Sequence, residues 1–303
     1  MAQMARQFYN VNLLTHRFKN DKDITIILGS AISTRKNNIG IPNVSESTSI
    51  LKKYFEDHNL STLFSEFVEE YGTSNEYQDC FSFAAALNGQ QLIRELVKSI
   101  VSVNIDRNTG KQNITKSIVD LVNFIKENPG KVINIVTTNF DTMIEEQLDN
   151  EGIAFNSHSI VSDSNYNDNS NGLINIIHIH GVWDKGDTMH TSNQLSAKRD
   201  LIESSLVNII SETNAYIMAY SGWEDSFMRS LATVMNNNKI EYQFSWCFYN
   251  KEHGIIERDY EDLFPLLTSA ISRERIQFFS GVDCFNFFEN CLVGNDVNQK
   301  KNN

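Results

Sequence analysis

The stretch "ITIILGSAIS", residues 24–33, begins as a continuous apolar run and passes directly into glycine and small polar residues. Hydrophobicity that is continuous rather than alternating is typical of strands covered on both faces, as in parallel sheets. Five more runs of this kind follow: "VINIVTTNF" from Val132, "LINIIHIHG" from Leu173, "AYIMAYSG" from Ala215, "FSWCFYN" from Phe244 and "RIQFFSG" from Arg275.

Segments with helical spacing lie between these runs, at 141–150, 197–213 and 225–237. Strands that alternate with helices predict βαβ units, and hence an α/β fold with a Rossmann-like doubly wound parallel sheet. We expect one catalytic domain over residues 1–303. The Asn- and Ser-rich segment 156–172 is predicted to be a loop, and the end "GNDVNQKKNN" is expected to fray or to continue into another domain.

Four further helical segments separate the first strand from the second, at 47–59, 61–71, 90–104 and 114–128. They predict an all-helical module inserted at about 44–130. Its apolar positions are expected to form the module's own core rather than a ligand groove; they include Ile93, Leu96, Val97, Ile100 and Val101.

Charge and composition narrow the classes of partner. Lys and Arg total 26 against 38 Asp and Glu, a formal net charge of -12, so the average surface repels phosphate backbones and direct nucleic-acid binding is not expected. No stretch approaches the roughly 20 apolar residues that span a bilayer, and we expect a cytoplasmic protein with no membrane partner. The cysteines are scattered and predicted to be reduced thiols; they are Cys80, Cys247, Cys284 and Cys291.

Polar side chains follow the strands at the points where the strands end, and ligands of doubly wound sheets bind beyond those carboxyl ends. The turn "GSAIS" is neither a GxGxxG nor a Walker loop. Gly29 and the small Ser30 and Ala31 would let backbone amides approach a pyrophosphate, although a purely structural turn explains them equally well.

Asn139 and Asp141 come directly after the second strand. Asp141 fits an Asx turn and a cap for the helix that begins near Thr142. A helix needs only one such cap, so Asn139 is better explained by a ligand.

His178 and His180 alternate with isoleucines, which predicts that both project from one strand face. A metal site would need a third ligand, and no cluster with recognised spacing accompanies them, so no metal is predicted. We expect His178 to be a hydrogen-bonded core residue and His180 to be the acid/base candidate.

Taken in order, five motifs resemble those of the sirtuin family. "GSAIS" matches the sirtuin GAGIS, "GIPN" from Gly40 matches GIP, "TTNFD" from Thr137 matches TQNID, His180-Gly181 matches the catalytic HG, and Asn250 with Glu252 matches N-x-E. The resemblance runs from residue 24 to about 285. An ordered series of five motifs is far more specific than any one of them.

The departures are equally informative. Sirtuins that deacylate proteins carry two Cys pairs on a zinc ribbon after the HG motif, whereas no cysteine lies between Gly181 and Cys247. Val44 and Ser45 stand where the family has Phe-Arg, and "YSGWEDSF" replaces the GTS-type loop. In these respects the chain resembles the divergent, zinc-free sirtuin-like domains of bacterial anti-phage defence systems, which consume NAD.

The resemblance implies an NAD+ glycohydrolase (NADase) that uses NAD as substrate without zinc and acts as an abortive-infection effector. It implies that Asn139 holds the ribose hydroxyl or the attacking water and that His180, with a near-neutral pKa, acts as base. The residues expected to bind NAD are Gly29, Ser30, Ala31, Ser33, Thr138, Asp141, Ser221, Gly222, Asn250 and Asp283.

Two other functions stay open at this point: an NAD-dependent protein deacylase, and a non-catalytic NAD or ADP-ribose sensor in a larger assembly. Because an NAD-depleting enzyme is toxic unless gated, we expect control by homo-oligomerisation, by a regulatory domain or by a partner. A hexameric ATPase, an Argonaute-type protein and a nucleotide sensor are the candidate partners.

Overall fold

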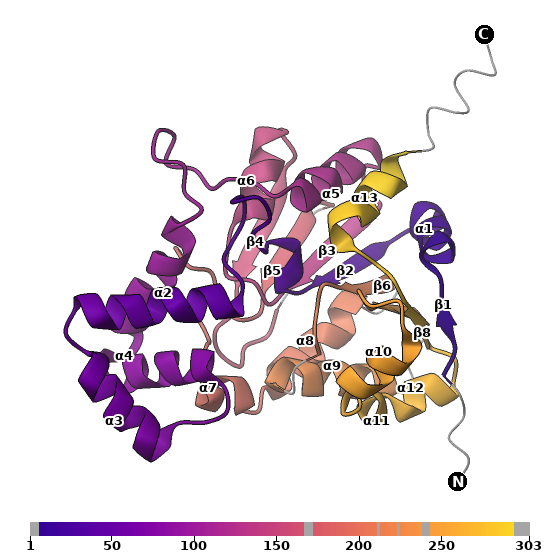
Figure 1. Cartoon of the computed structure of the whole chain (residues 1–303). Coiled ribbons are helices and arrows are strands. Elements are labelled where there is room, and N and C mark those ends of the chain that lie inside the picture. Colours follow the sequence, from indigo (N-terminus) through magenta and orange to yellow (C-terminus); the bar gives the residue numbers. More distant parts are fainter. Residues whose placement is uncertain (1–5, 167–171, 211–212, 223–224, 238–242, 294–303) are drawn as a thin grey trace.

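One sheet of eight parallel strands organises the described part of the chain, residues 6–166, 172–210, 213–222, 225–237 and 243–293 of the computed structural model (Figure 1). The strands lie in the order β1-β8-β7-β6-β2-β3-β5-β4, and every neighbouring pair is parallel. Their bounds are β1 (Phe8–Tyr9), β2 (Ile24–Leu28), β3 (Val132–Thr137), β4 (Phe155–Ser159), β5 (Ile174–His178), β6 (Asn214–Met218), β7 (Gln243–Cys247) and β8 (Ile276–Phe279).

The strand order is that of the Rossmann fold. When β2, β3, β5, β6, β7 and β8 are numbered one to six, the sheet reads 3-2-1-4-5-6 from the β5 side, which is the order of dinucleotide-binding sheets. All six expected strands are therefore confirmed, as is the Rossmann-like α/β fold. The order reverses at β2, which lies between β3 and β6, so the crevice where such folds bind ligands opens at the end of β2.

The two edge strands, β1 and β4, were not expected. The prediction of a loop over 156–172 was wrong at its start, because β4 (Phe155–Ser159) pairs with β5. Its residues are half-buried or exposed and it has a neighbour on one side only. An edge strand of this kind needs no apolar run, so polar composition hides it.

Helices cover both faces of the sheet. Alternate residues of β2 point to opposite sides: Ile26 and Leu28 pack with α1, α5, α6 and α13, whereas Ile27 packs with α8, α9 and α10–α12. The helical segments are α1 (Val11–Asn20), the 3₁₀ turn η1 (Ser30–Ile32), α2 (Val44–Asp57), α3 (Ser61–Tyr71), α4 (Glu76–Ser102), α5 (Lys116–Glu127), α6 (Met143–Asn150), α7 (Ser192–Ser196), α8 (Asp200–Ile210), α9 (Ser226–Asn236), α10 (His253–Asp259), α11 (Leu263–Leu266), α12 (Thr268–Ser272) and α13 (Cys284–Leu292).

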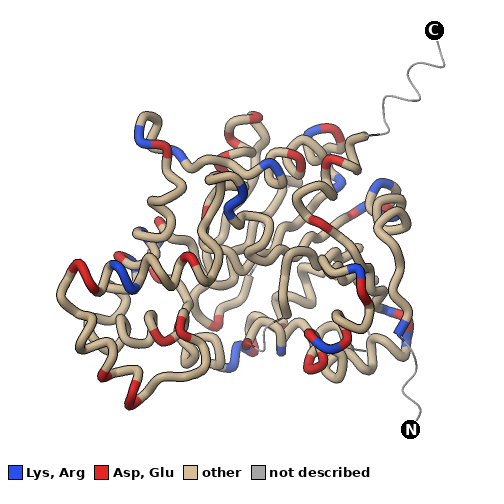
Figure 2. Tube along the Cα trace, viewed as in Figure 1, with Lys and Arg blue, Asp and Glu red and all other residues tan. Residues whose placement is uncertain are grey.

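Helices α2, α3 and α4 pack on one another and project to one side of the sheet (Figure 1). Acidic residues predominate on them in Figure 2. Helix α4 begins well before the predicted 90–104 and is interrupted at Asn88 and Gly89. Its apolar residues are buried in the same cluster as Ile26 and Leu28. The expectation of a separate core for the module was therefore wrong, because its core is continuous with that of the sheet. Helix α5 instead packs on α13 and α6. The module boundary at about 44–130 stays a prediction.

A buried polar ladder crosses four strands at one level. Thr25 is the register partner of Asn134, and Asn175 is the partner of both Asn134 and Asn156. Asn175 Nδ2 donates to Asn134 Oδ1 at 3.0 Å, Asn134 Nδ2 donates to Thr25 Oγ1 at 3.2 Å, and Asn156 Nδ2 donates to Asn175 Oδ1 at 3.3 Å. These bonds satisfy groups that would otherwise be costly to bury, and they are made only in this register.

No helix of the described residues is both long and apolar enough to cross a bilayer.

Gly29 is required by packing. Its N–H donates to Met218 O at 3.1 Å, and a Cβ at this position would lie 2.2 Å from Ala219 O. The backbone of the chain after β6 thus passes directly over Gly29.

Gly29→Ala is expected to lower the free energy of unfolding by roughly 1–3 kcal/mol or more, because backbone and not a flexible side chain must move. Urea denaturation measures this loss. Gly254→Ala is the matched control, since Gly254 has open space around its Cβ position and lies in α10; it should be neutral or slightly stabilising. Equal effects of the two variants would contradict the packing explanation.

Candidate functional site

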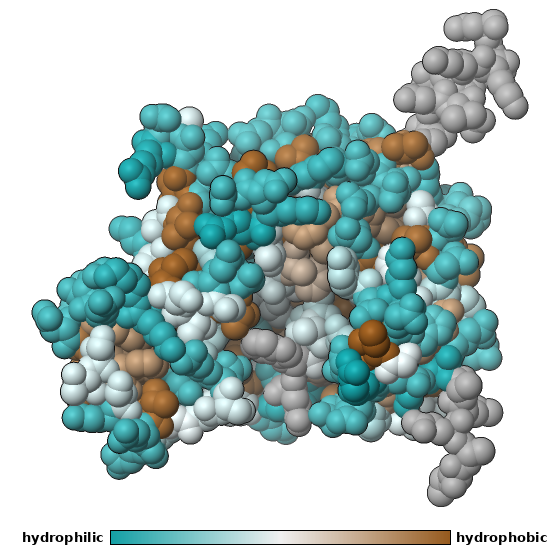
Figure 3. Space-filling model, viewed as in Figure 1, coloured by the Kyte–Doolittle hydropathy of each residue, from teal (hydrophilic) through white to brown (hydrophobic). Residues whose placement is uncertain are grey.

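A cavity of about 670 Å³ opens at the carboxyl ends of the central strands. Its walls come from η1, from the segments after β3, β5, β6, β7 and β8, and from α2 and α4, which contribute Ser47, Tyr77 and Gln78. Figure 3 shows this face hollowed near its centre, where apolar surface is framed by hydrophilic residues. The location is the one predicted from strand order.

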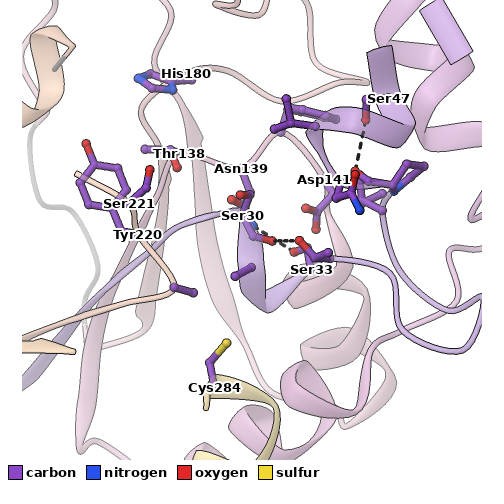
Figure 4. Close-up of a pocket in the computed structure, with 18 of the residues that line it drawn as sticks. Ser30, Ser33, Ser47, Thr138, Asn139, Asp141, His180, Tyr220, Ser221 and Cys284 are labelled. Atoms are coloured by element: carbon purple, nitrogen blue, oxygen red, sulfur yellow. Dashed lines mark hydrogen bonds between the residues drawn. The ribbon is translucent and has the colours of Figure 1, made fainter. Parts of the chain in front are cut away.

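Nine of the twelve predicted site residues line this cavity: Ser30, Ala31, Ser33, Thr138, Asn139, Asp141, His180, Ser221 and Asp283. In Figure 4, Ser30, Ser33, Asn139 and Asp141 gather at η1, with Thr138, His180 and Ser221 on the opposite side.

The other three, Gly29, Gly222 and Asn250, are not among the lining residues. Gly222 has a φ of +71° and lies over Trp246, while Asn250 Oδ1 accepts from Glu252 N at 3.0 Å before α10. In the structure these residues shape the chain around the cavity.

Asn139 combines one satisfied and one unsatisfied polar atom. Its Nδ2 donates to Ser33 Oγ at 3.0 Å, which fixes the amide orientation, and the side chain is only 6% exposed. Its Oδ1 is buried without a hydrogen-bond partner. A buried amide oxygen without a donor is costly, so the site is poised to accept a hydrogen bond from a ligand or water.

His180 is neutral at physiological pH. Burial lowers its pKa to about 3, and Arg199 and His190 add to this effect. The expected near-neutral pKa was therefore too high, because the sequence could not show how little water reaches the ring. Its Nε2 lies 3.4 Å from Asp225 Oδ2, and that carboxylate would stabilise a proton gained during a reaction.

His178 is not part of the cavity but supports it. Strand β5 ends at this residue, so His178 and His180 do not share a strand face. Its Nδ1 lies 2.7 Å from Asn139 O and its Nε2 lies 2.8 Å from Glu145 Oε1. A carbonyl oxygen can only accept, so Nδ1 carries a hydrogen. Burial opposes a charge here, yet Glu145 raises the pKa of His178, which indicates a buried imidazolium–carboxylate pair.

Asp141, two residues after Asn139, also lines the cavity. Its Oδ1 accepts from Met143 N at 3.3 Å, which is the expected Asx turn. The N-cap of α6 is Thr142, however, so the expected N-cap at Asp141 was wrong by one residue. Burial raises the pKa of Asp141 to about 6, although hydrogen bonds from Ser33 and Met143 oppose that rise.

Sequence reasoning missed several lining residues, above all Asp225 and His190. Asp225 is the N-cap of α9, and its Oδ1 accepts from Met228 N at 2.7 Å. Burial raises the pKa of Asp225 to about 6. Its sequence signal was present in "YSGWEDSF", but an Asp before a helix is most simply interpreted as a cap.

His190 carried no comparable signal, because its partners come from α4. Tyr77 Oη lies 3.2 Å from His190 Nδ1. Nearby contacts from α4 reach the same segment: Gln78 Oε1 accepts from Ser192 Oγ at 2.7 Å and Arg94 pairs with Asp187 at 2.9 Å. The segment 187–192 thus joins α4 to the cavity.

Among the described residues, no group of three or more His, Cys, Asp or Glu is arranged to hold a metal ion. Cys247 and Cys284 line the cavity as free thiols. Burial raises the pKa of Cys284 to about 12, so its thiol stays protonated and is a poor nucleophile.

His178→Ala is expected to reduce the free energy of unfolding by about 3–5 kcal/mol, because it leaves Glu145 as an uncompensated buried charge. The double variant His178→Ala/Glu145→Ala should lose less than the sum of the single variants, as measured by urea denaturation. The exposed pair Lys53 and Asp57 is the control. Its single and double alanine variants should give a coupling free energy of less than about 1 kcal/mol. Additive losses at His178 and Glu145 would refute the buried pair.

Asp141→Asn is expected to stabilise the protein at pH 7 by up to about 3 kcal/mol. A carboxyl whose folded pKa is raised to about 6 contributes stability below its unfolded pKa near 3.8 and loses it as pH rises through 6. The gain in the variant should therefore vanish below about pH 4. Denaturation at both pH values tests this, with the exposed Asp149→Asn as control; a gain independent of pH would contradict it.

One family model and several solved structures are similar to this chain. The family model of the SIR2-like domain matches residues 133–264, from β3 to α11. No curated protein matches the sequence. Similar solved structures include a Sir2 mutant with a p53 peptide and NAD, Sir2Tm bound to a propionylated peptide, and Sir2 bound to an acetylated peptide. Each is 9% identical, with TM-scores of 0.42, 0.44 and 0.45, over 95% of this chain and 100% of the other. The segment that is similar to the SIR2-like domain, residues 133–264, contains both Asn139 and His180.

Proposed function

We propose that this chain is an NAD+ glycohydrolase that cleaves NAD+ to nicotinamide and ADP-ribose. The observation that carries the proposal is the pairing of Asn139 Oδ1, which is buried without a donor, with the neutral imidazole of His180 in one cavity. That cavity lies at the reversal of strand order, where Rossmann folds bind dinucleotides.

The lining residues fit the parts of NAD+. Ser30 and Ala31 begin η1, and the first N–H groups of such a turn have no partner within it, so they suit a pyrophosphate. Thr138, Asn139 and His180 would face the ribose that carries nicotinamide, and Asp141 would lie beside them. Ser221 and Asp283 would contact the remainder of the dinucleotide, with Gly29, Gly222 and Asn250 shaping its surroundings.

The chemistry follows from these roles. Breaking the glycosidic bond develops oxocarbenium-like charge on the ribose, and nicotinamide leaves as a neutral group. Asn139 Oδ1 would accept a hydrogen bond from the attacking water or from a ribose hydroxyl. His180, neutral before the reaction, can take the proton that the water or hydroxyl releases.

Support for hydrolysis over protein deacylation comes from the sequence, in which no cysteine lies between Gly181 and Cys247. A chain that destroys NAD+ suits an abortive-infection effector in anti-phage defence. Such a role requires gating, for which we propose homo-oligomerisation, a regulatory domain or a partner protein.

His180→Ala and Asn139→Ala are each expected to lower nicotinamide release from NAD+ by about 10² to 10⁴-fold, because each removes a group at the reacting ribose. Chromatography of the products, with the chain alone and with products of neighbouring genes, measures this. The exposed His16→Ala is the control and should keep full activity.

The products separate the competing functions. Plain ADP-ribose supports the proposal, whereas O-acyl-ADP-ribose formed with an acyl-lysine peptide identifies a deacylase. Binding of NAD+ without turnover under all conditions identifies a sensor. Full activity in either Asn139→Ala or His180→Ala would remove the mechanism.

A further inference from the structure

Asp225 has two carboxylate oxygens with two different tasks. Oδ1 accepts from Met228 N at 2.7 Å and caps α9, whereas Oδ2 lies 3.4 Å from His180 Nε2. The Asp225 side chain is 9% exposed and lines the cavity. A cap needs one oxygen, so the second is available to His180. His180 Nε2 is buried without a hydrogen-bond partner in the described part of the chain, and Asp225 Oδ2 is the carboxylate oxygen within ion-pair distance of it; catalytic contacts of this kind often tighten into hydrogen bonds only when substrate binds.

The buried guanidinium of Arg199 is a positive charge that the Asp225 carboxylate can offset. Arg199 is 3% exposed, and its guanidinium donates to three carbonyl oxygens: Ile179 O at 2.7 Å, Ser162 O at 3.2 Å and Ile160 O at 3.4 Å. These partners carry no full charge. The positive field of Arg199 lowers the pKa of His180, and Asp225 and Asp163 are the carboxylates that offset that field.

Other groups also face Asp225. Arg229 lies one turn along α9, and its charge, like that of Arg199, favours the ionised carboxylate. The Tyr220 hydroxyl, from the segment after β6, also faces this carboxylate, and burial together with Asp225 raises the pKa of Tyr220. Burial has the opposite effect and is the largest influence on Asp225. Above about pH 6 the carboxylate is ionised and His180 is neutral.

We propose that Asp225 is a positioning residue, whose carboxylate holds His180 in the tautomer with hydrogen on Nε2 and leaves Nδ1 as the proton acceptor. Among the described residues no side chain or backbone group forms a hydrogen bond with Nδ1, so this nitrogen is available to substrate. The carboxylate also stabilises the imidazolium that forms when Nδ1 takes a proton, by the same logic as the carboxylate of a Ser-His-Asp triad.

The role of His180 Nδ1 as proton acceptor in the reaction rests on the proposed function. Water forms a bond to the ribose C1′ while the bond from C1′ to the nicotinamide nitrogen breaks, and its electron pair leaves with nicotinamide. The proton of the water passes to His180 Nδ1 and later to solvent. Asp225 takes no proton. The net reaction is NAD+ plus water to ADP-ribose, nicotinamide and a proton.

The tautomer of His180 can be measured without any turnover. Nitrogen-15 NMR of histidine-labelled protein at pH 7.5 distinguishes a ring nitrogen that carries hydrogen from one that does not, and His180→Gln assigns the signals. Wild-type His180 should show hydrogen on Nε2. Asp225→Asn keeps the cap and the size of the side chain but should shift the population toward Nδ1–H.

Asp163→Asn is the matched control. Asp163 also bonds the first turn of a helix, through Leu201 N at 2.8 Å and Ile202 N at 3.1 Å, and it also acts on Arg199, but it does not line the cavity. It should leave the His180 tautomer unchanged. Hydrogen on Nδ1 in the wild type, or the same tautomer in wild type and Asp225→Asn, would overturn the inference.

Steady-state kinetics provide the second readout. Asp225→Asn should lower kcat at least about tenfold with KM for NAD+ changed less than about twofold, and Asp225→Glu should restore part of the loss. Unchanged kcat in a folded Asp225→Asn variant would also overturn the inference. If the wild type shows no turnover of NAD+, the proposed function fails, while the NMR result still decides the role of Asp225.

Discussion

The register of the parallel strands is the constraint on which the site depends. Residues reach the carboxyl edge together only if the strands are aligned, and the ladder of Thr25, Asn134, Asn175 and Asn156 provides that alignment from the sheet interior. Apolar side chains alone would tolerate slippage, because one isoleucine packs nearly as well as the next. A slipped ladder would leave buried amides without partners, at a cost of about 1–3 kcal/mol for each group.

Burial then sets the charge states at this edge. The same exclusion of water makes His180 neutral and raises the pKa values of Asp141 and Asp225 to about 6. The charged pair of His178 and Glu145 is buried next to Asn139. Within a few residues of one another, the charge states that suit a reaction and the charge states that favour the folded protein are therefore different. A carboxylate such as Asp141 weakens the folded state at neutral pH, which is typical of a site built for a ligand rather than for stability.

The six buried strands could be predicted, because covered parallel strands have a distinct apolar pattern. The polar residues at their ends could be expected to meet at one edge, and most of the candidate site residues line the cavity at that edge. Strand β4 could not be predicted, since an edge strand needs no apolar pattern. Gly29 could be named as a candidate from the sequence. The requirement for glycine at this position, however, comes from its contact with Ala219, which is distant in sequence. Asp225 and His190 were missed because their significance comes from partners on other elements, and the pKa of His180 depends on burial that no local motif encodes.

The contacts of α4 with residues 187–192 connect this helix to the backbone of His180. Tyr77 holds His190, Arg94 holds Asp187, and between these points Met189 N donates to His180 O at 2.9 Å. One short segment therefore joins α4 to the backbone of His180. The placement of the imidazole thus depends on the packing of α4 as well as on the strands of the sheet.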